Sequence, residues 1–290
     1  MITDMKWLCC DPLRGQEFLP NAAKLEIAIN RQASINMRSR FLLSSGTTPA
    51  RTFSAGPRYA TEAIVAQESW VPLPSRGIWS PTPKGPLARC ILLVKPSSSE
   101  IGRLRSLTAA ALSDPSVKGQ AANQSISIID KILRTESLCP YDIIFETFQV
   151  HDFPARHTSV HPRTGELVGL HLDSWSRLPD SQRGEGSLRA CVNLGRVPRC
   201  LDVIPITSED GLSWLVASGK AEGSWSAGPL AQRLLAQRPD LKVLRLTQYP
   251  GELYVAPTEN LIHDGVRVVT DEPDLTLAVR VRLAVISATA

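Results

Sequence analysis

The chain has 290 residues, a formal net charge of +4 and a pI near 8.8. That length can bury a substantial core, and one domain is favoured over two. Its 32 cationic and 28 anionic side chains are spread without a basic run, and aromatic residues make up 6%. This pattern argues against a dedicated nucleic-acid surface.

The N-terminus lacks the basic start and apolar run of a secretory signal, and no stretch reaches the ~20 apolar residues of a membrane span. Six cysteines show neither a CxxC spacing nor the density of a disulfide scaffold. We therefore expect a soluble, cytoplasmic protein with reduced thiols and no membrane association.

Residues 1–88 are rich in Pro, Ser, Arg and Gly, which break every periodic pattern within about a dozen residues. They predict an irregular N-terminal arm or cap, with short helices near residues 21–31 and 60–67. Regular structure is expected from residue 89, where an apolar strand over 89–95 leads into a helix. Ser97 and Glu100 have the spacing of a capping box for that helix, and a second helix is predicted over 123–133.

From residue 141 the pattern changes to strands separated by turn formers. The strands are expected over residues 141–150, 188–194, 201–206, 242–246, 252–256, 265–270 and 275–286. A helical insertion over about 208–237 interrupts them, with helices at 208–219 and 229–237. The series predicts a mainly β fold with flanking helices and a double-stranded β-helix core, a cupin-like jelly roll spanning 89–290.

The last predicted strand alternates with period two. Its odd positions from Leu275 to Val285 are aliphatic, whereas Arg280 and Arg282 share the other face. If the aliphatic ridge packs on the helices, both arginines project into the barrel cavity. The alternative is that they face solvent.

Two histidines and one carboxylate are candidates for a metal site. His171 and Asp173 are two residues apart, so on a strand both side chains point to the same side. His263 follows the strand over 252–256 and precedes Asp264-Gly265, a turn signal, which predicts a position at the junction of two late strands. Two His and one carboxylate form the facial triad that holds Fe(II) and leaves the opposite positions open. The same three ligands would also suit zinc hydrolysis.

The order HxD, then a distant His, then an Arg on the last core strand resembles the Fe(II)- and 2-oxoglutarate-dependent oxygenase superfamily, over residues 141–286. The resemblance implies that His171, Asp173 and His263 bind iron and that the protein uses Fe(II), 2-oxoglutarate and O2. It implies Arg280 as the partner of the far carboxylate of 2-oxoglutarate, with Arg282 as a competitor. In related halogenases a small residue replaces the carboxylate, so that chloride can bind the iron. Because Asp173 is present, the resemblance implies hydroxylation, desaturation or ring closure and not halogenation.

Other residues are weaker candidates. Thr147, Gln149 and Asn193 are candidates for further contacts with the co-substrate. The alternative for Thr147 and Gln149 is solvent exposure at the edge of the sheet, and the alternative for Asn193 is a hydrogen bond to the backbone. The predicted rim of the active site flanks the metal ligands and comprises Trp175, Arg177, Thr258, Glu259 and Asn260. The remaining histidines, His151, His157 and His161, could bind a different metal together with Asp152, but they are interpreted as surface imidazoles of an exposed loop, with substrate contact as the next alternative.

These observations predict an oxygenase acting on a small molecule, such as an amino acid or a specialised-metabolite intermediate. One alternative is removal of alkyl groups from nucleic acid, which the charge pattern makes unlikely. Another is a jelly-roll binding protein without catalytic activity.

Overall fold

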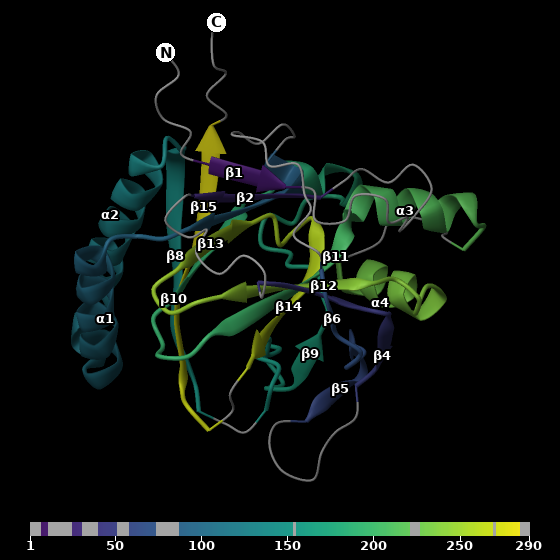
Figure 1. The fold of residues 1–290 in the computed structure, drawn as a ribbon, viewed down its shortest axis with the longest axis horizontal. Coiled ribbons are helices and arrows are strands. Elements are labelled where there is room, and N and C mark those ends of the chain that lie inside the picture. The colour runs from purple at the N-terminus through teal and green to yellow at the C-terminus, as the bar shows by residue number, and fades with distance from the viewer. Residues whose placement is uncertain are drawn as a thin grey trace, which may run out of the picture.

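A computed structural model describes residues 7–10, 25–30, 40–50, 58–73, 87–152, 155–220, 227–268 and 271–284. Its larger sheet has the strand order β1-β2-β7-β13-β10-β15-β8 (Figure 1). The bounds are β1 Trp7–Cys10, β2 Glu26–Asn30, β7 Cys90–Val94, β13 Leu253–Ala256, β10 Leu188–Asn193, β15 Asp274–Ala284 and β8 Cys139–His151. We call it the major sheet.

A second sheet, the minor sheet, has the order β14-β11-β12-β3-β6. Its strands are β14 Leu261–Arg267, β11 Arg199–Thr207, β12 Val243–Gln248, β3 Phe41–Ser44 and β6 Val71–Pro72. A small third sheet joins β4 Thr47–Pro49, β5 Tyr59–Ala66 and β9 Leu167–Gly169.

The chain alternates between the two large sheets as it runs from β8 to β15. Strand β10 lies in the major sheet, β11 and β12 in the minor sheet, β13 in the major, β14 in the minor and β15 in the major. Late strands therefore pair with early ones, as in β15 with β8 and β14 with β11. This is the topology of a double-stranded β-helix, so the predicted jelly-roll core is confirmed.

Helices cover the outer faces of both sheets (Figure 1). Helices α1 (Ser98–Ser113) and α2 (Lys118–Thr135) pack on the major sheet, and α3 (Ser208–Ala217) and α4 (Ala227–Gln237) pack on the minor sheet. The described residues also form the short 3-10 helices η3 (Leu87–Arg89), η4 (Pro115–Val117) and η5 (Asp180–Glu185). None of the described helices is long and apolar enough to cross a bilayer.

Strand alternation divides the apolar side chains among three clusters. On β11, Leu201 and Val203 face the space between the sheets, whereas Ile204 and Ile206 face α3 and α4. The aliphatic ridge of β15 packs against α1 and α2 as predicted, and Ala278 on its other face lines the cavity between the sheets. The core therefore surrounds a cavity that both sheets can furnish with polar groups.

The N-terminal expectations need correction. Glu26–Asn30 is strand β2, which pairs parallel to β7, and Tyr59–Ala66 is strand β5, so both predicted short helices are wrong where they are described. The described part of residues 1–88 adds strands to the sheets and is not an irregular arm there. A domain boundary near residue 88 remains a prediction.

The predicted capping box of α1 is confirmed. The Ser97 hydroxyl accepts the Glu100 backbone N–H at 3.3 Å, and the Glu100 carboxylate accepts the Ser97 backbone N–H at 3.0 Å. We expect Ser97→Ala to lower the free energy of unfolding by about 1 kcal/mol, because an N-terminal N–H loses its acceptor. Urea denaturation would measure this change, and no change would contradict it. Ser106→Ala, on the exposed face of the same helix, is the control.

Candidate metal centre

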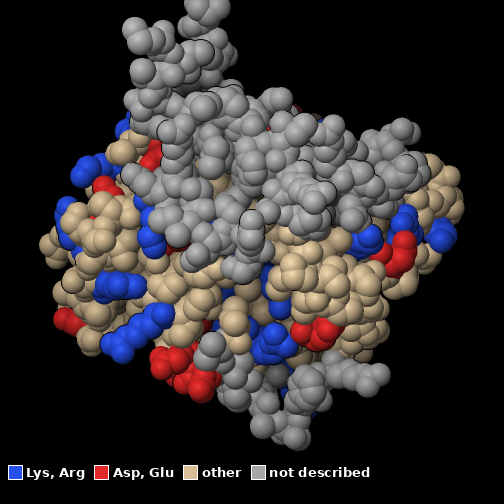
Figure 2. Space-filling model, viewed as in Figure 1, with Lys and Arg blue, Asp and Glu red and all other residues tan. Residues whose placement is uncertain are grey.

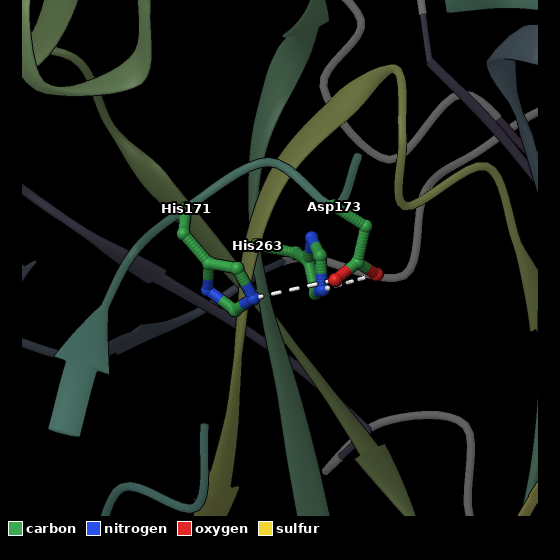
Figure 3. A group of neighbouring side chains, drawn as sticks. All are labelled: His171, Asp173 and His263. Carbon is green, nitrogen blue, oxygen red and sulfur yellow. Dashed lines mark ion pairs between the residues drawn. The ribbon is translucent and has the colours of Figure 1, made fainter. Parts of the chain in front are cut away.

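His171, Asp173 and His263 point toward one another (Figure 3), and all three line the cavity between the sheets. The Nε2 atom of His171 lies 3.6 Å from Oδ1 of Asp173, and Nε2 of His263 lies 3.5 Å from Oδ2 of the same carboxylate. Ligands at about 2.1 Å from a common ion and at right angles to each other are about 3 Å apart. A slight contraction of the three side chains would therefore place them around one cation.

The two imidazoles are held with Nε2 free to act as a ligand. Nδ1 of His171 is 2.8 Å from the carbonyl oxygen of Gly169, and Nδ1 of His263 is 3.0 Å from that of Leu261. A proton on each Nδ1 donates to its carbonyl, so the lone pair remains on Nε2. Nε2 of His263 and Oδ2 of Asp173 are buried without a hydrogen-bond partner. A metal ion would satisfy both atoms.

Local backbone structure fixes the three ligands. The backbones of His171 and His263 exchange hydrogen bonds of 3.0 and 2.9 Å, so two segments 92 positions apart are locked together. His263 lies within strand β14, not at the predicted junction before a turn. Gly169 has a φ of +66°, and a Cβ there would lie 2.4 Å from the carbonyl oxygen of Ile64. This position therefore requires glycine.

The loop after β9 holds Asp173 by its backbone. Its N–H donates to the carbonyl of Thr258 at 3.1 Å, and its own carbonyl accepts from Arg183 at 3.0 Å. Thr258 and Asn260 are buried and do not line the cavity, and Asn260 bonds Ser208 and the Ala88 carbonyl. Thr258 and Asn260 therefore support the site and do not form its rim, because the turn before β14 packs against the backbone of the loop that carries Asp173.

Electrostatics favour an ionised carboxylate between the histidines. Burial opposes ionisation of Asp173, but Arg189, His263 and His171 outweigh it and hold its pKa well below the usual range. Burial lowers the pKa of His263 to about 4, so this ring is neutral near pH 7. Burial also disfavours the charged form of His171, yet the bond to Asp173 leaves its pKa raised. Metal binding would displace that proton.

The cavity has a volume of about 370 Å³ and extends from the triad between the two sheets. The major sheet supplies residues of β8, β10, β13 and β15, and the loop over 158–162 closes one side. Of the predicted residues, Thr147, Gln149 and Trp175 line it together with the triad. Its other lining residues include Glu146, Thr158, His161, Arg189, Cys191, Arg199, Tyr254, Gly265 and Ala278.

Arg199 is the buried cation of this cavity, with its side chain 8% exposed. Its Nη1 lies 3.2 Å from Sγ of Cys191, and its Nη2 lies 3.4 Å from Oγ1 of Thr158 and 3.5 Å from Asp274. The Nε atom has no hydrogen-bond partner. A Cβ on Gly265 would lie 3.1 Å from Arg199 Nη2, which places the guanidinium beside that glycine. Gly265 is two residues, or about 7 Å of strand, from His263.

The two arginines of β15 are placed differently from the prediction. Neither Arg280 nor Arg282 is among the cavity-lining residues. Arg280 lies at the edge of the cavity, with Nε 3.4 Å from the Glu146 carboxylate, and Arg282 is exposed. The side-chain periodicity is as expected, but β15 runs past the end of the cavity, so its later residues lie beyond it.

Two further candidates fall outside the cavity. The Asn193 side-chain amide donates to the carbonyls of Val197 and Gln248 and accepts from the Gly195 N–H. Its hydrogen bonds are therefore made to the backbone, as the alternative interpretation expected. Arg177 is exposed, with a φ of +52°. The positions of these two side chains depend on the backbone of neighbouring turns, and the period-two pattern of a strand does not predict them.

The interpretation of the other histidines as surface imidazoles is wrong for two of them. His151 is 4% and His157 is 8% exposed, and His157 Nδ1 lies 2.5 Å from Asp264. Burial lowers the pKa of His151 to about 4. His161 is half-buried at the cavity wall. His151 is the last residue of strand β8, and His157 is held against β14 by its bridge with Val266.

The sequence interpretation missed Arg189, Arg199 and Glu146. Arg189 and Cys191 share a face of β10 with period two, a signal that was present in the sequence. Arg199 follows Pro198, and the strand was predicted to begin only at residue 201. Glu146 lies beside the irregularity between Ala278 and Val279 in the pairing of β15 with β8, which no local pattern reveals.

No protein-family model matches the chain, and no curated protein sequence matches it. Among solved structures, the chain is similar to the Kdo hydroxylase KdoO, a non-heme Fe(II) alphaketoglutarate dependent dioxygenase in complex with alphaketoglutarate and Fe(III). The match has 15% identity and a TM-score of 0.39 and covers 68% of this chain and 81% of that one. It is also similar to the non-heme alpha ketoglutarate dependent epimerase SnoN, with 12% identity, a TM-score of 0.35, and 66% and 77% coverage. Such distant likenesses do not assign a function.

Proposed function

We propose that this protein is an Fe(II)- and 2-oxoglutarate-dependent oxygenase that hydroxylates, desaturates or cyclises a small molecule. One observation carries the proposal: Nε2 of two histidines and one carboxylate converge at the end of a cavity that also holds a buried arginine. A three-ligand set on one side leaves positions for a bidentate co-substrate and for O2. Arg199 would pair with the far carboxylate of that co-substrate.

Each residue has a distinct role in this arrangement. His171, Asp173 and His263 would hold Fe(II), which with 2-oxoglutarate and O2 supplies the oxidation of an unactivated C–H bond. Arg199 would orient 2-oxoglutarate along the cavity, and Thr158 beside it would offer a hydroxyl to the same carboxylate. Buried walls such as Tyr254 exclude bulk water from this end, which strengthens the charge pairing.

Zinc hydrolysis with the same ligands is less well supported. It gives no role to the buried Arg199, whose guanidinium lies beside Gly265, a residue about 7 Å of strand from His263. A dicarboxylate such as 2-oxoglutarate would bind the metal at one end and this cation at the other. A cavity of about 370 Å³ is within the size range of small-molecule sites. Exclusion of nucleic acid as a substrate remains a prediction. On the face shown in Figure 2, acidic and basic side chains of the described residues are interspersed.

The test is anaerobic titration of the protein with Fe(II) and then 2-oxoglutarate. We expect a weak visible metal-to-ligand charge-transfer band, because the keto acid would chelate iron held by three protein ligands. Succinate, which lacks the keto oxygen, is the matched control and should give no band. Iron binding without a band would contradict the 2-oxoglutarate assignment, and tight zinc binding with hydrolase activity would favour the alternative.

A further inference from the structure

Beside the triad lies a second charged group, which the metal and co-substrate roles do not use. It consists of Arg189 on β10, Arg280 on β15, Glu146 on β8 and Trp175 in the loop after Asp173; we call it the arginine pair site. Three adjacent strands of the major sheet thus present it toward the metal ligands. Arg189 Nη2 is 3.7 Å from Oδ2 of Asp173, which places the group next to the metal centre.

Three polar atoms of this group have no hydrogen-bond partner, and two of them, Arg280 Nε and Glu146 Oε2, are held only by long ion pairs. The two guanidinium groups share the Glu146 carboxylate at 3.4 Å each, distances that are too long for strong charge-assisted hydrogen bonds. Nε of Arg189, Nε of Arg280 and Oε2 of Glu146 are all buried without a hydrogen-bond partner. Buried polar atoms are normally satisfied, so several unsatisfied atoms at one place indicate a missing polar ligand.

Aromatic stacking holds the arginines in position. The Trp175 ring lies 4.5 Å from Cζ of Arg189 and 5.7 Å from Cζ of Arg280. Arg189 lines the cavity and Arg280 borders it through Glu146, and both side chains are 26% exposed, so a solute at this edge of the cavity can reach them. When Asp173 binds a metal ion, Arg189 and Arg280 share only the Glu146 carboxylate. The arginine pair site then carries a net charge of about +1.

We propose that the arginine pair site recognises an anionic group, a carboxylate or a phosphate, on the primary substrate. This inference rests on the proposed oxygenase function and adds a substrate class to it. An oxyanion would accept from N–H groups of both guanidinium groups, and such charge-assisted hydrogen bonds are stronger than those to neutral hydroxyl or amide groups. Arg199 lies on β11 of the minor sheet and contacts Cys191, which is two residues along β10 from Arg189. The co-substrate and the substrate anion therefore have separate cations.

The test uses the anaerobic protein loaded with Fe(II) and 2-oxoglutarate and a panel of matched probes. Small carboxylates are paired with their methyl esters, and sugar phosphates with the free sugars, and binding is measured by isothermal titration calorimetry. We expect at least one anion to bind on the order of tenfold more tightly than its neutral twin. Whether that anion is a carboxylate or a phosphate identifies the source of the charge.

Arg280→Gln should reduce this preference to about twofold or less. It is preferred to Arg189→Gln because Arg189 lies 3.7 Å from Asp173, whereas Arg280 pairs with Glu146, so the metal centre is left intact. Arg282→Gln, two residues further along the same strand and exposed, is the matched control and should keep the preference. A panel in which no anion exceeds its neutral twin, or equal effects of both substitutions, would overturn the inference.

The charge-transfer band separates failure of this inference from failure of the proposed function. If the band forms in the wild type and in Arg280→Gln but no anion preference is found, the oxygenase assignment stands and the substrate class is wrong. If no band forms while anion preference depends on Arg280, the anion site stands and the co-substrate assignment is wrong.

Discussion

Replacing Asp173 with alanine is expected to weaken Fe(II) binding by more than a hundredfold. Loss of groups that merely support metal ligands costs about 10- to 100-fold in affinity, and a ligand itself contributes more. Asp173 is also the only carboxylate between the two imidazoles in the described metal group, so its removal leaves no anion to offset the cation. His171→Ala should act similarly, through loss of one Nε2 ligand. Anaerobic calorimetry with Fe(II) measures both.

His161→Ala is the control for these substitutions. His161 lies at the wall of the same cavity and is half-buried, but it does not belong to the metal group. Iron binding should be unchanged in this variant. Retention of wild-type iron affinity in Asp173→Ala, with a normal circular dichroism spectrum, would refute the metal centre.

Long aliphatic strands were predictable because their signal is local. The alternation of Leu277, Val279 and Val281 with small or charged residues fixes which face packs on helices, whatever the sheet does elsewhere. The capping box of Ser97 and Glu100 is equally local. Since the jelly roll alternates strands between two sheets, the order of these segments was enough to predict the core.

Short strands of the N-terminal region were not predictable in the same way. Residues 60–67 have the composition of a helix, yet Thr61 and Glu62 lie in strand β5, which pairs with β4 and β9. Pairing with neighbours that are distant in sequence overrides weak local preference. Strand β2 depends similarly on its parallel partner β7.

Local sequence patterns were not sufficient to predict that Arg199 is the buried arginine of the cavity. Periodicity placed Arg280 correctly on the face opposite the ridge, but the depth of a residue along the cavity depends on how the two sheets close. Arg199 reaches the cavity from the minor sheet, and its guanidinium meets Cys191 of the major sheet. Only the pairing of the sheets brings these two residues together, and no local pattern reveals it. The triad was predicted because the HxD spacing, the strands around His263 and the resemblance to a known family agreed.

Arg199→Gln is therefore expected to raise the dissociation constant for 2-oxoglutarate by roughly 30-fold or more. Removing one partner of a buried charge pair costs about 2–5 kcal/mol, and 2 kcal/mol corresponds to about 30-fold. Glutamine keeps a polar side chain of smaller size, so Thr158 still has a neighbour. Arg199→Lys keeps the charge but not the planar pair of donors and should give an intermediate value. Titration of the anaerobic Fe(II) protein, followed by the charge-transfer band, gives these constants.

The arginines of β15 provide the comparison that decides between the two assignments. Arg280→Gln and Arg282→Gln should change 2-oxoglutarate affinity by less than about threefold, since neither side chain lines the cavity. Arg199→Gln should still bind Fe(II) as the wild type does, because the guanidinium contacts Cys191, Thr158 and Asp274, none of which is a metal ligand. Loss of iron binding would mean that the substitution disrupts the fold, and Arg199→Lys would then carry the test. If Arg280→Gln weakens 2-oxoglutarate binding more than the Arg199 variants do, the co-substrate carboxylate lies at β15 and Arg199 has a structural role through Asp274.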